Sequence, residues 1–100
     1  MHYLLTYQVA PDYLARRGDY REEHLALAWA AAERGELLLG GAVGDPIDSA
    51  VLLFQCDSAE IPSAFALADP YVQNGLVRQW QVSPWHTVVG AAAAAPVRPA

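Results

Sequence analysis

The apolar run from Ala50 to Cys56, which only Gln55 interrupts, constrains the fold of this chain more than any other segment. A strand whose residues are apolar on both faces is typical of the interior of a sheet, where both faces are covered. The run therefore predicts a central strand.

Three other segments have the patterns of strands. The segment His2–Val9 alternates, so that Tyr3, Leu5, Tyr7 and Val9 share one face, which we expect to be core. The other two expected strands are Leu37–Val43 and Leu76–Val89, the second bent at Pro84.

Two helices separate these strands. The first begins near Asp19 and is expected to end at Gly35, and its apolar face includes His24. The second begins at Asp57 or Ser58 and runs to about Leu67, before a turn that opens at Asp69-Pro70. The order strand, helix, strand, strand, helix, strand predicts an α+β fold of the ferredoxin-like βαββαβ type. Its antiparallel sheet would have helices on one face and the first and third strands at its centre.

Length and charge limit the classes of function. The chain has 100 residues, enough for one modest core, so a second copy would help to bury surface and a homodimer is expected. Residues 1–89 would form the domain and the Ala/Pro-rich residues 90–100 a flexible tail. Six arginines, no lysine and a net charge of -5 argue against nucleic-acid binding.

The lack of recognisable targeting signals and the single cysteine both favour the cytoplasm. No apolar stretch reaches the roughly 20 residues that cross a membrane, and the start of the chain does not read as a signal peptide. Cys56 has no cysteine partner within the chain and reads as a small core residue. We therefore expect a cytoplasmic protein with no membrane partner.

His24 is the strongest candidate for chemistry. An imidazole on the inward face of a helix, beside a carboxylate, could act as a general base near neutral pH. The alternative is a buried histidine that hydrogen-bonds to the backbone or to Tyr20. Arg21, one turn earlier, could hold a carboxylate or phenolate of a small substrate, or could form an ordinary salt bridge.

Asp69 has two competing interpretations. It could orient His24 and stabilise its charged form, or it could cap the turn that Pro70 begins. Tyr71, Gly40 and Gly41 could line a substrate cleft, and each also has a purely structural reading.

The remaining candidates favour structural roles. His2 and His86 lie near strand ends and are expected to be solvated or at a rim rather than metal ligands. Trp29, Trp80 and Trp85 are expected in the core or in an interface. No motif for a phosphate, a dinucleotide or a metal is present, so no cofactor and no metal are expected.

Four segments in this order resemble the YciI-like (YCII-related) family over roughly residues 2–89. They are Arg21-Glu22-Glu23-His24-Leu25, Gly35-Glu36-Leu37-Leu38-Leu39-Gly40-Gly41, Ala68-Asp69-Pro70-Tyr71 and Gln81-Val82-Ser83-Pro84-Trp85. The resemblance implies a dimeric α/β barrel of ferredoxin-like protomers and an active site that pairs His24 with Asp69. The short loop from Gly44 to Ser49 and the alanine-rich tail depart from the family.

The resemblance leaves the reaction open. Relatives include a dehydrochlorinase that acts on a chlorinated hydroxyquinol, and the fold is similar to that of muconolactone isomerase. The main hypothesis is a cofactor-independent lyase or isomerase that moves a proton on a small aromatic or lactone-like substrate. The alternatives are a non-catalytic ligand-binding or interaction domain and a cofactor-independent monooxygenase.

Overall fold

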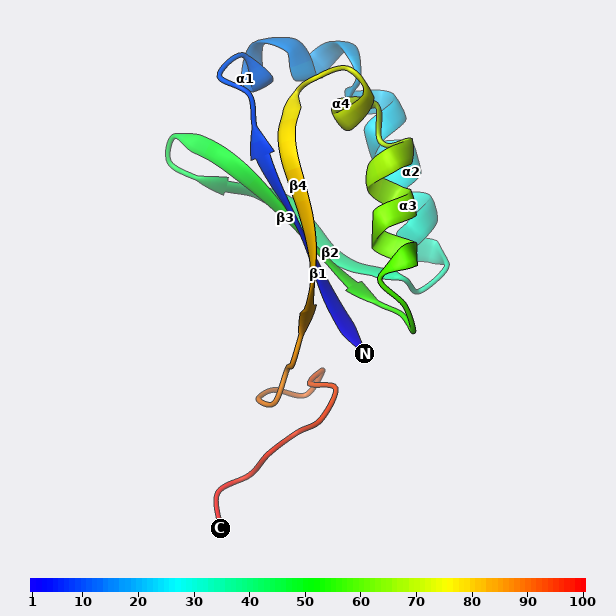
Figure 1. Ribbon diagram of the computed structural model, residues 1–100, viewed down its shortest axis with the longest axis vertical. Helices are drawn as coiled ribbons and strands as arrows, with labels where there is room; N and C mark the ends of the chain where they lie inside the picture. The colour runs from blue at the N-terminus through cyan, green and yellow to red at the C-terminus, as the bar shows by residue number, and fades with distance from the viewer.

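The sheet has four antiparallel strands in the order β2-β3-β1-β4, as seen in a computed structural model that describes residues 1–100 (Figure 1). The strands are β1 (His2–Val9), β2 (Leu37–Gly44), β3 (Ile47–Gln55) and β4 (Val77–Trp85). The prediction that the first and third strands are central is confirmed. This strand order is that of a ferredoxin-like α+β fold.

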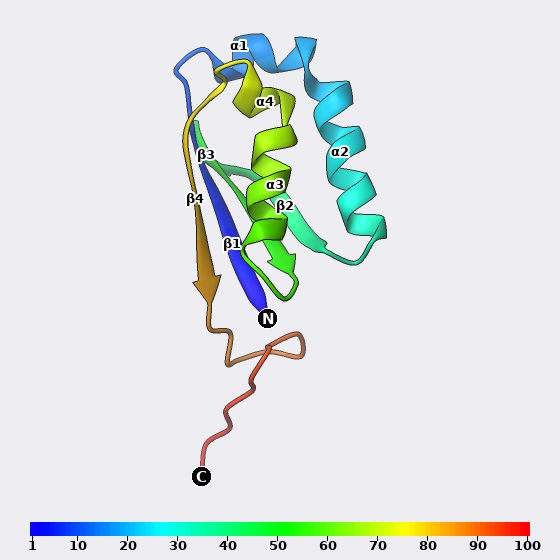
Figure 2. The ribbon, with the colours of Figure 1, turned by 45° about the vertical axis from the view of Figure 1, so that its right-hand side comes forward.

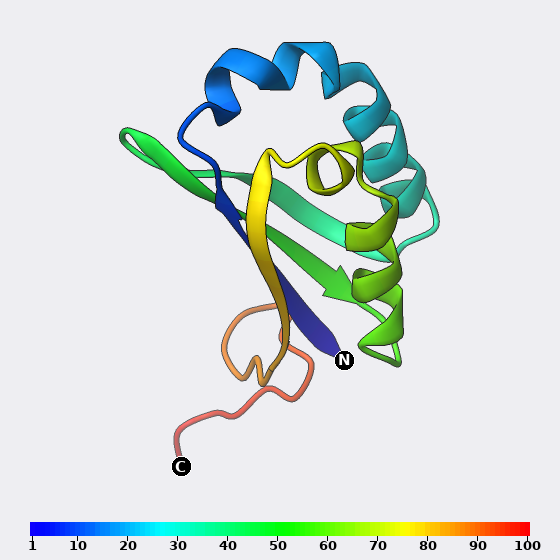
Figure 3. The ribbon, with the colours of Figure 1, turned by 45° about the horizontal axis from the view of Figure 1, so that its top comes forward.

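The helices lie together on one face of the sheet (Figure 2), whereas the β2–β3 hairpin extends beyond them (Figure 3). They are α1 (Tyr13–Arg16), the 3-10 turn η1 (Arg17–Asp19), α2 (Arg21–Glu33), α3 (Glu60–Ala68) and α4 (Pro70–Gln73). Gly35 follows α2 with a φ of 79°, a left-handed conformation that favours glycine, so the predicted end of this helix is confirmed. None of the helices is long and apolar enough to span a bilayer.

The alternation in β1 produces the core as expected. Tyr3, Leu5 and Tyr7 point toward the helices and are buried, while Leu4 and Thr6 on the other face are half-buried. Fully burying one side chain such as Leu5 stabilises the fold by about 2 kcal/mol. The other buried apolar residues are Tyr13, Ala31, Leu37, Ala50, Leu52, Phe54, Phe65, Ala66, Tyr71, Leu76 and Val77.

The expectation that β3 is covered on both faces is wrong for the single chain. Ala50, Leu52 and Phe54 face the helices and are buried, but Val51 and Leu53 on the opposite face are only half-buried. The reason is that both long helices lie on the same side of the sheet (Figure 2). The apolar run therefore leaves part of its surface without cover from its own chain.

Several side chains lie elsewhere than the sequence indicated. His2 is buried, with Nδ1 2.6 Å from the Thr87 hydroxyl oxygen, so the prediction of a solvated or rim side chain is wrong for the single chain. The pairing of β1 with the end of β4 places Thr87 against this histidine. His86 is exposed, as predicted.

Not all of the tryptophans lie in the core of the single chain. Trp80 packs partly against the core, whereas Trp29 and Trp85 are 66% and 47% exposed in the single chain. An apolar helical arc does not specify how much of it the opposing sheet can cover. In the segment 90–100, the backbone N–H groups of Ala94 and Ala95 hydrogen-bond to Thr87.

Candidate active site

Asp69 is a fully buried carboxylate between α3 and α4. Proline at the next position disfavours helical backbone at Asp69, which is extended with φ -72° and ψ 122°. Its Oδ1 accepts a hydrogen bond of 3.0 Å from the backbone N–H of Tyr71 and so caps α4. The capping interpretation of Asp69 therefore describes one of its contacts.

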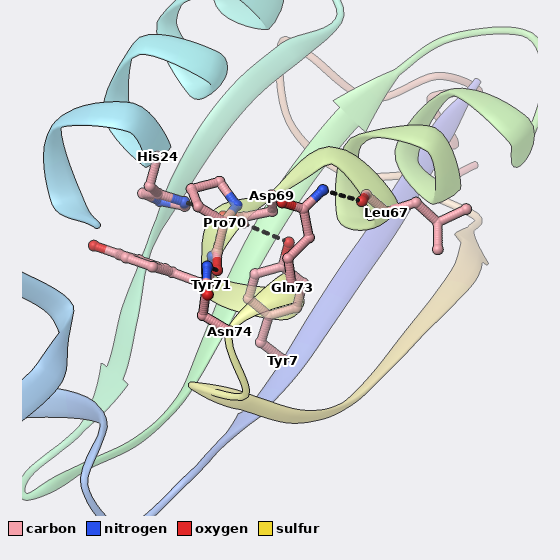
Figure 4. A network of polar contacts seen from close by, with 8 residues as sticks. All are labelled: Tyr7, His24, Leu67, Asp69, Pro70, Tyr71, Gln73 and Asn74. Carbon is pink, nitrogen blue, oxygen red and sulfur yellow. Dashed lines mark hydrogen bonds and ion pairs between the residues drawn. The ribbon is translucent and has the colours of Figure 1, made fainter. Parts of the chain in front are cut away.

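The same carboxylate also contacts His24. Nδ1 of His24 lies 2.9 Å from Oδ1 and 3.0 Å from Oδ2 of Asp69, although the two residues are 45 positions apart (Figure 4). The His24 side chain is 16% exposed, whereas that of Asp69 is 0% exposed. The sequence offered the cap of a turn and the partner of His24 as competing roles for Asp69, but in the structure the same carboxylate makes both contacts.

The contact determines which ring nitrogen of His24 can act as a base. A carboxylate only accepts hydrogen bonds, so the ring proton lies on Nδ1 and the lone pair of a neutral imidazole lies on Nε2. Both hydrogen bonds of the ring involve Nδ1. Nε2 is therefore the nitrogen available to a ligand.

Tyr7 on β1 supplies a third donor to Asp69, which the sequence did not reveal. Its hydroxyl donates to Oδ2 at 2.8 Å. Burial, reinforced by the negative charge of Asp69 and this hydrogen bond, raises the pKa of Tyr7 far above its ordinary value, so the phenol remains a proton donor. The only sequence signal was a tyrosine on the core face, where a buried hydroxyl needs a partner.

Tyr71 fixes the plane of the imidazole. Its ring stacks on that of His24 with centroids 4.0 Å apart and planes at 11° (Figure 4), and it meets the Tyr13 ring edge-on at 5.7 Å. Burial and then Tyr13 raise the pKa of Tyr71, while the Arg21 and Arg17 guanidinium groups oppose this shift. The ring of His24 is thus held by stacking on one face and by a carboxylate at Nδ1.

A cavity of about 330 Å³ lies beside His24, between α2 and the inner side of β2 and β3. The cavity is lined by His24 and by all four residues predicted from the sequence to bind substrate, which are Arg21, Tyr71, Gly40 and Gly41. Asp69 does not line it, but it hydrogen-bonds to three residues that do, namely His24, Tyr7 and Tyr71. The other lining residues are Tyr7, Tyr13, Arg17, Leu25, Ala28, Trp29, Ala32, Leu37, Leu38, Leu39, Ala42, Ala50 and Leu52.

Gly40 and Gly41 in β2 line this cavity without a side chain. A Cβ at Gly40 would lie 3.4 Å from Cγ of Leu52, at the tight end of van der Waals contact, whereas one at Gly41 would meet nothing within 4 Å. A side chain at Gly41 would therefore occupy open space. Arg17 and Trp29 also line the cavity, and the sequence did not single out either as a site residue.

Metal-ligating side chains do not gather in the structure. No group of three or more His, Cys, Asp and Glu residues is placed to hold a metal ion. Cys56 is partly buried, its thiol lies 3.3 Å from the Ser58 carbonyl oxygen, and burial raises its pKa. A raised pKa disfavours the reactive thiolate, in agreement with a packing role for this residue.

Comparison with known proteins gives a family and two similar folds. Residues 1–86 match the family described as YCII-related domain. Among curated proteins none matches the sequence.

Two solved structures share the architecture. One is the 5-chloro-2-hydroxyhydroquinone dehydrochlorinase TftG of Burkholderia phenoliruptrix AC1100, in complex with 2,5-dihydroxybenzoquinone. It has a TM-score of 0.72 and 22% identity, over 87% of this chain and 95% of that one. The other is protein Atu4242 of Agrobacterium tumefaciens, with a TM-score of 0.58 and 17% identity, over 94% of this chain and 98% of that one. At these identities the similarity establishes a shared fold.

Proposed function

Because the chain belongs to the YCII-related domain family, which its residues 1–86 match, we propose that it is a small-molecule enzyme of the lyase or isomerase type. His24 is its general acid and base, and Asp69 positions His24. The observation that carries this proposal is the contact of 2.9 Å between Nδ1 of His24 and the buried Asp69, on the wall of a cavity large enough for one substrate.

The proton moves through Nε2 of His24. Nε2 removes a proton from a carbon or oxygen atom of the substrate, and the imidazole becomes positively charged. The Asp69 carboxylate stabilises that charge at Nδ1 without taking the proton itself. In an isomerase the same proton returns to another substrate atom; in a lyase the electron pair expels a leaving group, and the proton passes to that group or to water.

The walls of the cavity favour a small unsaturated ring. They combine apolar side chains with the aromatic rings of Tyr71 and Trp29, and such surfaces bind flat apolar bodies. A volume of about 330 Å³ suits a substrate of one or two rings. The similar fold of a dehydrochlorinase with a bound dihydroxybenzoquinone supports an aromatic or lactone-like substrate. The proton transfer uses only side chains of the protein, so the proposal includes no cofactor.

The functional unit in this proposal is a cytoplasmic homodimer. The sheet face opposite the helices carries Leu4, Val51 and Leu53, which are half-buried, and Leu39, which is 72% exposed. Packing this face against a second copy would cover these side chains and close the two sheets into an α/β barrel.

The experiment is a search for turnover with matched histidine variants. The purified protein is incubated in D₂O with chlorinated hydroxyquinols, other phenols and unsaturated lactones, and NMR follows deuterium incorporation and product formation. His24→Asn should lower the rate by a factor of about 10² to 10⁴. His86→Asn, a matched change at an exposed histidine outside the cavity, should leave the rate unchanged.

The same experiment separates the alternatives. Ligand binding without exchange or product after long incubation would contradict the proposal and favour a non-catalytic binding domain. Oxygen uptake with a phenol would instead favour a cofactor-independent monooxygenase. Turnover that survives His24→Asn would contradict the assignment of the base.

A further inference from the structure

The cavity carries positive charge that the proton transfer at His24 does not use. Arg17 and Arg21 both line it, and neither has a carboxylate oxygen within ion-pair distance. The two arginines that do form ion pairs, with Asp12 and Glu36, are Arg16 and Arg34, and neither lines the cavity. In a chain with a net charge of -5, two unpaired cations on one cavity mark a place for negative charge.

Tyr71 adds a buried donor without an acceptor. The residue is 2% exposed, and its hydroxyl is the one buried side-chain polar atom that has no hydrogen-bond partner. Buried hydroxyl groups are nearly always hydrogen-bonded, so an orphan of this kind points to a missing acceptor. Arg21 and Tyr71 both line the cavity, and the positive charge of Arg21 opposes the rise in the pKa of Tyr71, so the guanidinium and the phenol belong to the same end of the cavity.

The opposite end of the cavity is apolar. Along α2, Arg21 comes one turn before His24, and Trp29 comes about 12 Å after Arg21 at 1.5 Å per residue. Leu25 and Trp29 of α2 and Leu38 of β2 line the cavity there, and all three are exposed. Arg21, the imidazole of His24 and the apolar side chains of Leu25 and Trp29 therefore follow one another along α2, and Arg17 lies just before it in η1.

Arg17 is oriented by an aromatic contact. Its guanidinium carbon lies 5.6 Å from the centre of the Tyr13 ring, in the range of a cation–π interaction. The planar guanidinium presents paired N–H donors that match the two oxygens of a carboxylate. The exposed acids of the first turn of α2, Glu22 and Glu23, do not line the cavity and do not pair with these arginines.

We propose that Arg17, Arg21 and the Tyr71 hydroxyl bind an oxyanion, so that the ligand of this cavity is a flat unsaturated acid. Its carboxylate or phenolate lies at the start of α2, its ring lies beside His24, and any apolar extension points toward Trp29. The inference rests on the proposed function in taking this ligand to be the substrate. Binding can nevertheless be measured without turnover.

The test compares charged probes with neutral isosteres by NMR titration of the whole protein. Benzoate is compared with benzamide, and para-nitrophenolate with para-nitroanisole. At least one anion should bind about tenfold more tightly than its isostere, which corresponds to about 1.4 kcal/mol. A preference in the benzoate pair assigns a carboxylate, and a preference in the phenolate pair assigns a phenolate.

The variants identify the groups that cause the preference. Arg17→Gln, Arg21→Gln and Tyr71→Phe should each reduce the anion preference several-fold and leave the affinity for the neutral isostere unchanged. Arg78→Gln, an equal loss of charge at an exposed arginine of β4 outside the cavity, should retain the preference. Circular dichroism of each variant confirms that the fold is retained.

Four outcomes would overturn the inference: equal affinity for anion and isostere, no detectable binding of either anion, an equal effect of Arg78→Gln, or a preference that survives all three cavity variants. His24→Asn distinguishes this inference from the proposed function, because it should lower the rate of turnover by a factor of about 10² to 10⁴ and retain the anion preference. Anion preference in a protein without any turnover would support the inference and contradict the proposed function.

Discussion

The Asp69 carboxylate joins the start of α4 to the imidazole of His24, because its Oδ1 lies 3.0 Å from the backbone nitrogen of Tyr71 and 2.9 Å from Nδ1 of His24. Tyr71, whose position this cap determines, is also the residue whose ring stacks on His24. One carboxylate therefore sets the orientation of the imidazole both directly and through the helix that it caps.

Replacement of Asp69 by Asn should affect both activity and stability. An amide group can present its NH₂ to Nδ1, which would move the ring proton to Nε2 and remove the base, so we expect the rate to fall on the order of a thousandfold. The loss of a buried charged partner should lower the free energy of unfolding by about 3 kcal/mol. Urea unfolding and the turnover assay measure the two effects. A variant with wild-type turnover would contradict this role of Asp69.

Tyr7→Phe should destabilise the protein while leaving its core volume almost unchanged. The variant removes the 2.8 Å hydrogen bond to Asp69, and a hydrogen bond to a charged group contributes about 2 kcal/mol. Tyr3→Phe is the matched control on the same strand and face, because the Tyr3 hydroxyl contacts only Sδ of Met1 at 3.6 Å. Equal stability of the two variants in urea unfolding would contradict the importance of the Tyr7 contact.

Tyr71→Phe should keep or raise the stability. Its hydroxyl is buried without a partner, and a buried unsatisfied polar group costs about 1 to 3 kcal/mol, so removing it is expected to raise the free energy of unfolding by about 1 kcal/mol. Thermal and urea unfolding measure the change. A clear loss of stability would show that the hydroxyl has a partner in solution.

Alkaline pH should unfold the protein through its buried tyrosines. The pKa values of Tyr7 and Tyr71 are raised above the ordinary 10.0 in the folded chain, so above about pH 10 the unfolded chain loses protons that the folded chain retains. The stabilisation is therefore complete below pH 10 and is lost as the pH rises through the raised pKa values. Unfolding free energies measured on both sides of pH 10 should show this fall, with a smaller slope in Tyr7→Phe. A fall of equal slope in that variant would exclude Tyr7 as a source.

The sheet face opposite the helices should be an interface between two copies of the chain. Leu53→Glu places a charge among the half-buried residues of that face, so light scattering should find the variant at the mass of one chain and the wild type at twice that mass. Leu67→Glu is the control, at a leucine of α3 that is 63% exposed. A wild-type protein of single-chain mass would contradict the proposed dimer.

The elements and their order could be predicted because each depends on local patterns. Alternation in residues 2–9, the apolar run at 50–56 and the position of Gly35 identify a strand, a strand and a helix end that the structure contains, although the second strand, β3, begins at Ile47 and ends at Gln55. Which face of the sheet the helices cover could not be predicted from the sequence. Val51 and Leu53 have the same apolar character as Leu52, and only the placement of the helices distinguishes them.

The candidate site was predictable in its residue types but not in its contacts. Periodicity placed His24 on an inward face, and the family resemblance paired it with Asp69. Neither could show that Tyr7 reaches Asp69 from 62 positions away or that His2 is buried against Thr87. Such contacts depend on the register of β1 against its neighbours and on how deeply each side chain lies.

The central claim is that His24 is a base at Nε2 because Asp69 holds the proton at Nδ1. NMR correlation of the ring protons and nitrogens of His24, in isotopically labelled protein, measures directly which nitrogen carries the proton in the neutral ring. The account predicts a proton on Nδ1 and a bare Nε2, with the proton moved to Nε2 in Asp69→Asn. A proton on Nε2 in the wild-type protein would contradict the account, because the nitrogen that faces a ligand would then be a donor and not a base.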